Sequence, residues 1–453
     1  MKHNITKIAL MFYMLVLYFG YLHAQNYDNY IRELVNQKEW FALEKEYTRL
    51  EDSIAAPDLK WVAKTMIGLR FNQSNEAISS IDTLLYNYQS IIGFPNSVEL
   101  LRYKLYLLDE RGEYEYAANE LGDFIDQVSP YISQQELREF QFQHSVYNSL
   151  RHQNKPTIDK PDSNVIVPFG TMEADFTFNN SDGTTQEVTN TFGIVKTTIQ
   201  GKEYIFLLDT GYEKSCIFNN VSKDINLHYF SDSINIIGTG IIQGRSAILD
   251  SISIGDVTLY NSAVLISDNV LEKYGINGKE IAEGLHGIIG IDFIKRLGEI
   301  QIYPNDRKIV IPCEESELPT SGRNIIFDKE YLIVKAFIKE DLTTFHLDTG
   351  SSSSNMLKSY YLKNKDVIER EYEKDFSMIS GVGSDFKRHT IYKIPSLSLT
   401  VDETSFSFEE LDVLTENYFL EDPNSDGSLG MDFIRKFNKV TLNLNKMFIQ
   451  LEK

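Results

Sequence analysis

The stretch FLLDTG at residues 206–211 is a short apolar run that ends in Asp-Thr-Gly, and FHLDTG at residues 345–350 repeats this pattern 139 residues later. The apolar run predicts a buried β-strand, and Asp and Gly predict a tight turn directly after it. One acid in such a turn is most simply explained as a loop residue or a strand cap. Two acids, Asp209 and Asp348, in matching contexts predict that the chain contains two copies of one structural unit.

The similarity between the two copies continues toward the C-terminus. GIIGIDFIKRLGEIQIYPNDRKIVI at 287–311 matches GSLGMDFIRKFNKVTLNLNKMFIQL at 427–451, and NIIGTGI at 235–241 matches MISGVGS at 378–384. Each copy therefore predicts a strand, the Asp-Thr-Gly turn, a β-ribbon with a glycine-rich turn, an apolar turn that ends in glycine, a short helix and a closing strand. The alternative is a duplicated β-domain whose aspartates only form turns. It does not explain why the acid precedes the second glycine of the apolar turn by 81 residues in one copy and 82 in the other.

Residues 25–152 predict helices, because apolar residues such as Trp40, Leu43 and Tyr47 recur there at helical spacing. The turn DERGEY at 109–114 separates two such apolar stripes, and this arrangement loosely resembles a tetratricopeptide hairpin. Arrays of helical hairpins usually present a concave surface, so one expectation is a protein partner on this region. The alternative is that the helices only cap the domain that follows.

The N-terminus has the pattern of a secretory signal peptide. Lys2 and Lys7 precede an apolar run from Ile8 to Leu22, and the small residue Ala24 follows. An uncleaved membrane anchor is the alternative, but the run is shorter than the ~20 residues that cross a bilayer. We therefore expect an exported protein, periplasmic, cell-surface or secreted, with no membrane span after the signal is removed.

The spacing of the apolar residues changes from helical to alternating near residue 165, after the proline-bearing segment HQNKPTIDKPDSNVIVP at 152–168. A chain of 453 residues is long enough for two or three domains. We expect a signal peptide at 1–24, a helical domain at 25–152, a linker at 153–166, a first β lobe at 167–320 (lobe 1) and a second β lobe at 321–453 (lobe 2).

Composition argues against several classes of function. The net charge is −21 and no basic stripe occurs, so a nucleic-acid partner is not expected. The eight histidines form no Cys/His cluster and no H-E-x-x-H motif, so the sequence does not support a catalytic zinc site. Cys216 and Cys313 are the only cysteines, and whether they form a disulfide is left open.

The repeated motif resembles the aspartic peptidases, both the retroviral proteases (retropepsins) and the pepsins. The resemblance covers roughly residues 190–453. It implies a multidomain chain in which all-α helical hairpins precede a mostly-β, bilobed acid-protease fold made of two pseudo-symmetric retropepsin-like lobes. It also implies an aspartic endopeptidase that uses no metal and no organic cofactor. Its expected substrate is an extended peptide or protein, bound as a β-strand between the lobes.

The chemistry explains why this family needs two acids. Peptide-bond hydrolysis requires a base that activates water and an acid that protonates first the carbonyl oxygen and then the leaving amine. Two carboxylates held about 3 Å apart share one proton, and their titration belongs to the pair. The resemblance assigns this pair to Asp209 and Asp348.

The resemblance also assigns supporting roles. Thr210 and Thr349 would hydrogen-bond across the interface between the lobes, and Gly211 and Gly350 would let the chain turn beneath the acids. Ser351 follows the second motif, as in pepsins. The remaining assignments are the flap-like turns that would close over a peptide, at Gly238, Gly240, Gly381 and Gly383, and the glycines of the turns through which the acid loops thread, at Gly290 and Gly430.

The first motif departs from the family, because Tyr212 and Glu213 stand where small residues are usual. We expect the Tyr212 ring to narrow a subsite or obstruct a substrate. If Glu213 points inward, we expect it to raise the pKa of the acid pair. These two residues favour an alternative function, a catalytically silent retropepsin-like protein that binds a peptide or glycopeptide.

Other polar residues near the motifs are given structural roles. His346 lies two residues before Asp348 on the same strand, and we expect it to be a buried or ladder-facing histidine rather than part of a serine triad. Asp292 and Asp432 are expected to cap the short helices that follow them. EDPNSDGS at 421–428 lacks the spacing of an EF-hand and predicts a polar turn.

Overall fold

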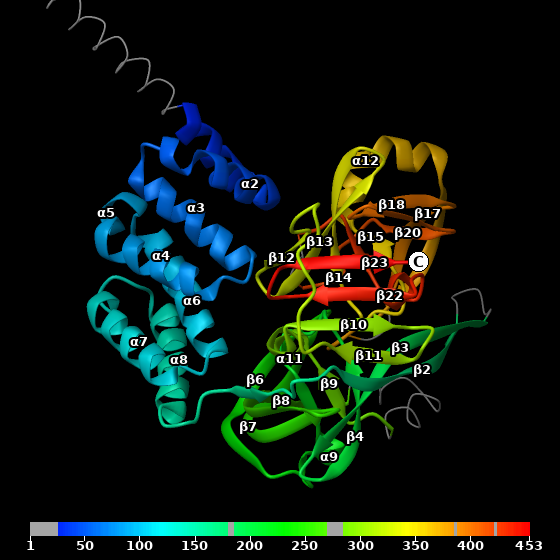
Figure 1. Cartoon of the computed structure of the whole chain (residues 1–453), viewed down its shortest axis with the longest axis horizontal. Coiled ribbons are helices and arrows are strands. Elements are labelled where there is room, and N and C mark those ends of the chain that lie inside the picture. The colour runs from blue at the N-terminus through cyan, green and yellow to red at the C-terminus, as the bar shows by residue number, and fades with distance from the viewer. Residues whose placement is uncertain (1–25, 180–184, 270–283, 385–386, 421–423) are drawn as a thin grey trace, which may run out of the picture. The chain divides into compact units, whose positions relative to one another are not determined.

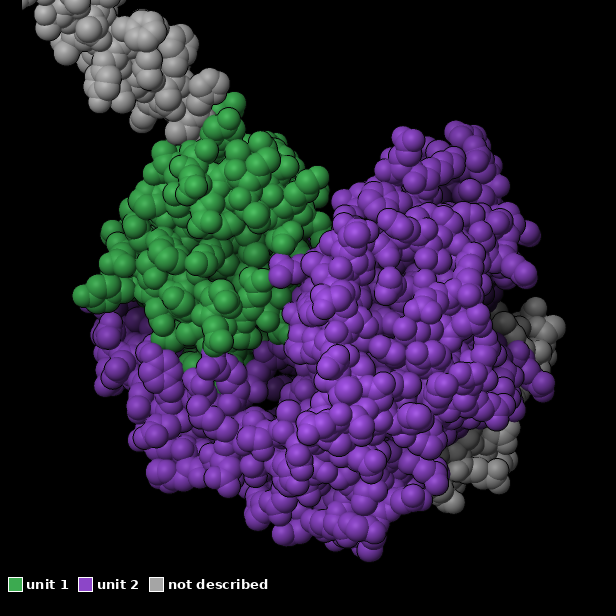
Figure 2. Space-filling model, in the orientation of Figure 1, with its two compact units in different colours: residues 1–108 green, residues 109–453 purple. Residues whose placement is uncertain are grey.

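The computed structural model describes residues 26–179, 185–269, 284–384, 387–420 and 424–453 (Figure 1). The signal peptide predicted at 1–24 and the first part of the polar turn at 421–428 lie outside these residues. Within the described ranges, no helix is long and apolar enough to cross a membrane. The chain divides into two compact units, residues 1–108 and residues 109–453 (Figure 2).

The first unit is helical. Its helices pack through apolar faces at helical spacing, and buried residues such as Leu43, Ile81 and Leu84 form its core. The α3–α4 hairpin is tight, because a Cβ added at Gly68 would lie 2.9 Å from the backbone nitrogen of Ala77. The helices are residues 26–36, α2 (Trp40–Leu50), α3 (Pro57–Arg70), α4 (Ser74–Asn87), α5 (Gln89–Ile92) and most of α6 (Phe94–Glu110).

The second unit begins with two further helices, α7 (Tyr114–Val128) and α8 (Gln134–Leu150). The boundary between the units therefore lies near the end of α6, whereas the sequence led us to place a domain boundary after residue 152. Close packing explains the difference: at Gly112, in the turn before α7, an added Cβ would lie 2.2 Å from the Pro156 ring.

The segment predicted as a linker at 153–166 is attached to lobe 1. It contains β1 (Thr157–Asp159), which pairs antiparallel with β8 (Val257–Ser267), and it ends in the first residues of β2. The Arg296 guanidinium also donates a hydrogen bond to the carbonyl of Thr157. The prolines and polar residues of this stretch thus flank a short edge strand rather than a free connector.

The two lobes repeat one strand order. In lobe 1 the order is β3-β4-β9-β5-β8-β7-β6, and in lobe 2 the corresponding order is β13-β14-β21-β15-β20-β17-β16. The further elements of lobe 1 are β2 (Val165–Asn179), β3 (Thr185–Ile199), β4 (Lys202–Leu208), β5 (Cys216–Phe218), α9 (Asn219–Ser222), β6 (Leu227–Ile237), β7 (Ile241–Ile254), β9 (Gly287–Ile289), α11 (Ile291–Leu297), β10 (Glu299–Tyr303) and β11 (Lys308–Ile311). Those of lobe 2 are β12 (Ile325–Asp328), β13 (Tyr331–Ile338), β14 (Asp341–Leu347), β15 (Asn355–Met356), α12 (Lys358–Glu371), β16 (Glu373–Ile379), β17 (Lys387–Ile394), β18 (Leu397–Val401), β19 (Thr404–Phe408), β20 (Leu411–Leu414), β21 (Gly427–Leu429), α13 (Met431–Ile434), β22 (Lys439–Asn443) and β23 (Phe448–Glu452).

One sheet joins the lobes. The closing strand β22 of lobe 2 pairs antiparallel with β10 of lobe 1, and β23 and β11 extend the ladder on either side (Figure 1). The helical region followed by a mostly-β part with two sheets confirms the predicted fold class.

Candidate active site

Asp209 and Asp348 occupy equivalent places in the two lobes. Asp209 follows β4, and Asp348 follows β14; each of these strands runs parallel to a short strand that begins with glycine. The Asp209 N–H donates to the Ile289 carbonyl at 3.0 Å, and the Asp348 N–H donates to the Leu429 carbonyl at 2.9 Å. The backbone of both acids is thus fixed at the end of a buried parallel pair.

The two threonines join the acid loops across the lobes. The N–H of Thr210 donates to Oγ1 of Thr349 at 3.0 Å, and the N–H of Thr349 donates to Oγ1 of Thr210 at 3.1 Å. Each hydroxyl in turn donates to a carbonyl of the other lobe, Thr210 to Leu347 at 2.7 Å and Thr349 to Leu208 at 2.8 Å. The four bonds obey an approximate twofold axis, and both threonines are buried.

The glycines of the two motifs bring the carboxyl groups together. The Gly211 N–H donates to Asp209 Oδ1 at 2.9 Å, and the Gly350 N–H donates to Asp348 Oδ1 at 3.0 Å. A Cβ at Gly211 would lie 2.5 Å from Asp348 Oδ1, and one at Gly350 would lie 2.2 Å from Asp209 Oδ2. Each glycine is therefore required because the acid of the other lobe lies directly against it.

The Asp209 and Asp348 side chains hydrogen-bond each other. Burial and then the nearby charge of Asp348 raise the pKa of Asp209 well above its ordinary value, although the N–H groups of Gly211 and Gly350 act in the opposite direction. Two carboxyl groups held this close together favour sharing one proton. Such a pair suits acid–base catalysis on a single water.

The raised pKa of Asp209 predicts a pH-dependent effect on stability. The folded chain binds this proton more tightly than the unfolded chain, so the contribution of Asp209 to stability is lost as the pH rises above 3.8, its ordinary value. We expect Asp209→Asn to raise the unfolding temperature at neutral pH and to leave it nearly unchanged at about pH 3. Thermal unfolding followed by circular dichroism measures this, with Asp256→Asn at an exposed turn as the control. If Asp209→Asn does not raise the unfolding temperature at neutral pH, this result contradicts a raised pKa of Asp209.

The acid loops rest on a second repeated contact that the sequence analysis missed. Ser215 accepts a hydrogen bond from the Gly290 N–H at 3.0 Å and donates one to Asp292 at 2.7 Å. In lobe 2, Ser354 makes the same two bonds, to Gly430 at 3.0 Å and to Asp432 at 2.7 Å. The signal was present, because each serine lies six residues after its acid.

These contacts correct the role expected for Asp292 and Asp432. Neither acid is the N-cap residue, because that position is taken by Gly290 or Gly430, but each carboxylate accepts a first-turn N–H, from Phe293 at 2.8 Å or from Phe433 at 2.9 Å. The same carboxylates also hold the serine below the acid loop. Burial raises the pKa of Asp292 to about 6, against the opposing effects of the Lys214 charge and of hydrogen bonds from Ser215 and Phe293. The chain after each acid motif lies directly against the glycine of the apolar turn: a Cβ at Gly290 would lie 2.6 Å from the Tyr212 carbonyl oxygen, and one at Gly430 would lie 2.8 Å from that of Ser351.

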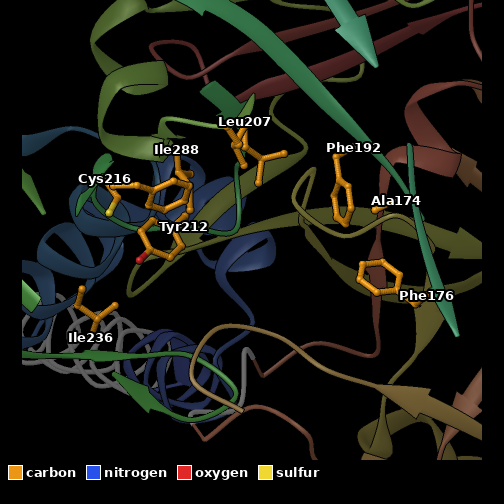
Figure 3. Close-up of a cluster of buried hydrophobic side chains, with 10 residues drawn as sticks. Ala174, Phe176, Phe192, Leu207, Tyr212, Cys216, Ile236 and Ile288 are labelled. Atoms are coloured by element: carbon orange, nitrogen blue, oxygen red, sulfur yellow. The ribbon is translucent and has the colours of Figure 1, made fainter. Parts of the chain in front are cut away.

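Tyr212 does not take the position that its place in the sequence suggested. Its ring is buried in an apolar cluster of lobe 1, beside Cys216 and Ile288 (Figure 3). Burial raises the pKa of the Tyr212 phenol well above its ordinary value, and the hydroxyl hydrogen-bonds Cys216. The ring is thus part of the core of lobe 1, and the expectation that it obstructs a substrate is wrong.

We expect Tyr212→Ser to destabilise the chain rather than to improve peptide binding. Removing a buried aromatic ring leaves a cavity and costs about 3 to 5 kcal/mol. Tyr212→Phe keeps the ring and loses only the hydrogen bond to Cys216, which is worth about 1 kcal/mol. The free energy of unfolding in denaturant measures both variants. Equal stability of Tyr212→Ser and wild type would place the ring outside the core.

The residues after Tyr212 contact the helical turn at 109–114. Lys214 Nζ binds Asp109 at 3.1 Å, and Lys295 Nζ on α11 binds Glu110 at 2.8 Å. Burial lowers the pKa of Lys214, but the charges of Asp109 and Glu213 outweigh this effect and raise it overall. Glu213 is half-buried and acts on this lysine. The turn between α6 and α7 therefore braces the loop that carries Asp209.

His346 is buried between aromatic rings. Its ring centroid lies 4.9 Å from that of Tyr331 and 6.0 Å from that of Phe419, both edge to face. Neither ring nitrogen has a hydrogen-bond partner, and burial lowers the pKa of His346. These contacts are those of a neutral core histidine.

The glycine-rich turns of the two lobes meet. Turn 238–240 follows β6, and turn 381–383 follows β16. The Gly240 N–H donates to the Val382 carbonyl at 2.9 Å, and the Thr239 and Ser384 hydroxyls hydrogen-bond at 2.7 Å. A Cβ at Gly240 would lie 1.8 Å from the Gly383 carbonyl oxygen, so this contact requires glycine. Each lobe thus contributes one of the two turns that hydrogen-bond each other.

Comparison with known proteins gives a partial match. A family model described as aspartyl protease matches residues 195–293, which contain Asp209 and the turn at Gly290. The crystal structure of Basic 7S globulin from soybean is similar at a TM-score of 0.39, with 9% sequence identity, over 64% of this chain and 95% of that chain. No curated protein sequence matches the chain.

Proposed function

We propose that this chain is an exported aspartic endopeptidase that hydrolyses peptide bonds with a water activated between Asp209 and Asp348. The observation that carries the proposal is the close approach of these two carboxyl groups, which come from equivalent turns of the two lobes and each lie against the glycine that follows the other acid. The aspartyl-protease match over residues 195–293 supports the same fold for the part of lobe 1 that bears Asp209.

The proposed reaction uses each acid in turn. The ionised carboxylate takes a proton from the water as its oxygen attacks the peptide carbonyl, and the protonated carboxyl gives its proton to the carbonyl oxygen. The resulting gem-diol then collapses: one of its hydroxyls returns a proton to the pair as the C=O bond re-forms, the leaving nitrogen receives a proton from the pair, and the C–N bond breaks. The two acids end with one proton between them, as they began. The N–H groups of Gly211 and Gly350 stabilise the ionised form throughout.

The proposed substrate is an extended peptide or protein. A peptide that lies as a strand exposes alternate backbone groups, and the glycine-rich turns 238–240 and 381–383 have backbone groups able to bind it. Because these turns hydrogen-bond each other, substrate entry requires them to separate first. The alternative of a catalytically silent binding protein rested on Tyr212 and Glu213. Tyr212 packs in the core of lobe 1, and Glu213 acts on Lys214.

Digestion of a peptide library tests the proposal. Residues 25–453 are incubated with proteome-derived peptides between about pH 3 and pH 7, with and without a statine-type inhibitor, and the products are identified by mass spectrometry. We expect endopeptidase cleavage that the inhibitor abolishes. Tight binding of the inhibitor without cleavage at any pH would instead support the silent alternative. Cleavage that the inhibitor leaves unchanged contradicts the proposed chemistry.

A further inference from the structure

The acid loops of the two lobes rest on the same internal contacts. In lobe 1 the Ile291 N–H donates to the Tyr212 carbonyl at 2.8 Å, and in lobe 2 the Met431 N–H donates to the Ser351 carbonyl at 2.8 Å. The serine contacts described above are also equivalent. Both acid loops are therefore held by the same frame, and a difference in their support must come from residues outside it.

Lys214 provides such a difference. It belongs to the loop that follows Asp209, and the residue 139 positions later, in the loop of lobe 2, is Ser353. Ser353 is exposed, whereas the Lys214 side chain is only 24% exposed and its Nζ binds Asp109 at 3.1 Å. Asp109 is the second-last residue of α6. The first acid loop is thus joined to a helix by an ion pair, and the second has an uncharged residue in the same place.

A second ion pair joins the same turn to α11. Lys295 Nζ on this helix binds Glu110 at 2.8 Å, and both side chains are mostly buried. The turn that carries the two acids is held in place itself. The Gly112 N–H donates to the Asp109 carbonyl at 2.9 Å, and a Cβ at Gly112 would lie 2.2 Å from the Pro156 ring. Two adjacent acids on a fixed turn therefore hold both the first acid loop and the helix beside it.

The surroundings of the Asp109–Lys214 pair strengthen it. Burial raises the pKa of Tyr114 on α7 to about 12, and the charges of Asp109 and Lys214 act on this pKa in opposite directions. The same two charges act on Tyr147 of α8. The pair therefore lies beside two buried aromatic residues, where opposite charges attract each other more strongly than at an exposed surface.

The Lys214 charge also reaches the carboxylate that supports the acid loop. It opposes the rise in the pKa of Asp292, whose Oδ1 accepts hydrogen bonds from the Ser215 N–H at 2.9 Å and from the Ser215 hydroxyl at 2.7 Å. An ammonium group without Asp109 would be attracted to Asp292 and would compete there with Ser215. Because the ammonium binds Asp109, the Asp292 carboxylate remains available to hold Ser215.

We propose that Asp109 and Glu110 are positioning residues for hydrolysis, which keep the loop of Asp209 in the place that the shared water requires. The inference rests on the proposed function. The two acids act through Lys214 and Lys295. A displacement of about 1 Å in a reacting group can lower a rate about a hundredfold, so a loop held slightly out of place slows the reaction without preventing peptide binding. The end of α6 therefore contributes to the reaction rather than only covering lobe 1.

Variants that remove one charge test the proposal. Asp109→Asn removes the charge and keeps the shape. Glu113→Gln is the matched control in the same turn, because Glu113 binds Arg111 and Lys155. Rates are measured on the best library peptide, and active sites are counted by titration with a statine-containing peptide, so that unfolded chains do not contribute. We expect Asp109→Asn to lower kcat per active site about tenfold with KM changed less than about twofold, and Glu113→Gln to change neither.

A second substitution separates positioning from a loss of stability. Lys214→Met removes the ammonium that would compete for Asp292. We therefore expect the double variant, Asp109→Asn with Lys214→Met, to recover about threefold or more of the kcat lost in Asp109→Asn. A double variant no faster than Asp109→Asn contradicts the action through Lys214. If Asp109→Asn does not fold, Glu110→Gln takes its place, and a kcat per active site equal to that of Glu113→Gln then overturns the inference.

Measurements without turnover separate this inference from the proposed function. Calorimetry gives the dissociation constant of a statine-containing peptide, and mass spectrometry gives hydrogen–deuterium exchange at residues 206–216, with residues 345–355 of lobe 2 as the matched segment. We expect Asp109→Asn to weaken binding and to speed exchange in the first segment only. Wild type that binds this peptide without cutting any substrate contradicts the proposed function, while the change confined to the first segment still supports positioning. Affinity and exchange equal to those of Glu113→Gln overturn the inference, whether or not the wild type cuts peptides.

Discussion

Asp348→Asn is expected to lower kcat/KM for peptide hydrolysis about a thousandfold or more, while the chain stays folded and still binds a statine-containing peptide. The amide cannot accept the proton of the attacking water or share one with Asp209, so the acid–base contribution of the pair is lost. The close approach to Gly211 is kept, because Asn and Asp have nearly the same shape. Initial rates on the best library peptide measure the effect.

The two acids should behave as one unit. Asp209→Asn is expected to be about as damaging as Asp348→Asn, and the double variant should be little worse than either, because each acid is useless without the other. Asp256→Asn makes the same chemical change on an exposed turn and should retain the wild-type rate. If the Asp348→Asn variant cuts peptides as fast as wild type, the hydrolysis does not take place at this site.

Thr210→Val is expected to produce the largest loss of stability among single conservative changes near the site. The valine leaves the N–H of Thr349 without its acceptor and the Leu347 carbonyl without its donor, both in a buried interface. An unpaired buried polar group costs about 1 to 3 kcal/mol, so the two together predict a loss of about 2 to 6 kcal/mol. Chemical denaturation of wild type and variant measures the difference.

Two further variants make this test specific. Thr210→Ser keeps the hydroxyl and removes only a methyl group, so it should lose much less than Thr210→Val. Thr349→Val should match Thr210→Val, because its bonds to Thr210 and Leu208 are the same by the approximate twofold axis. Thr210→Val and Thr210→Ser of equal stability would show that the cross-lobe bonds contribute nothing.

The acid pair was predictable because the sequence contains the Asp-Thr-Gly motif twice. A single Asp-Thr-Gly carries little information, but two copies with matching spacing to Gly290 and Gly430 identify the unit and align its parts. The same alignment contained Ser215 and Ser354, which were overlooked because serines are common in turns. Repetition thus predicts which residues are equivalent, and contacts across the repeat follow from it.

The orientation of a single side chain, and strands that lie outside the repeat, were not predictable in the same way. The residue after a strand can turn inward or outward, so the sequence did not show that Tyr212 enters the core of lobe 1. The long pairing of β2 with β3 was missed because the repeat was anchored on the acids and on the glycines after them, whereas these two strands lie before the first anchor. The strand at Thr157–Asp159 was missed because prolines on both sides dominate the pattern there.

The pairing of β10 with β22 has a consequence for how the acid pair is assembled. Either lobe made as a separate polypeptide would present an uncovered backbone edge, which favours association with another copy. Two identical halves would then meet only at sufficient protein concentration. Because both halves are covalently linked, their encounter is intramolecular and dilution does not separate them. The linkage also ensures that lobe 1 always pairs with lobe 2. The two lobes can therefore differ in structure.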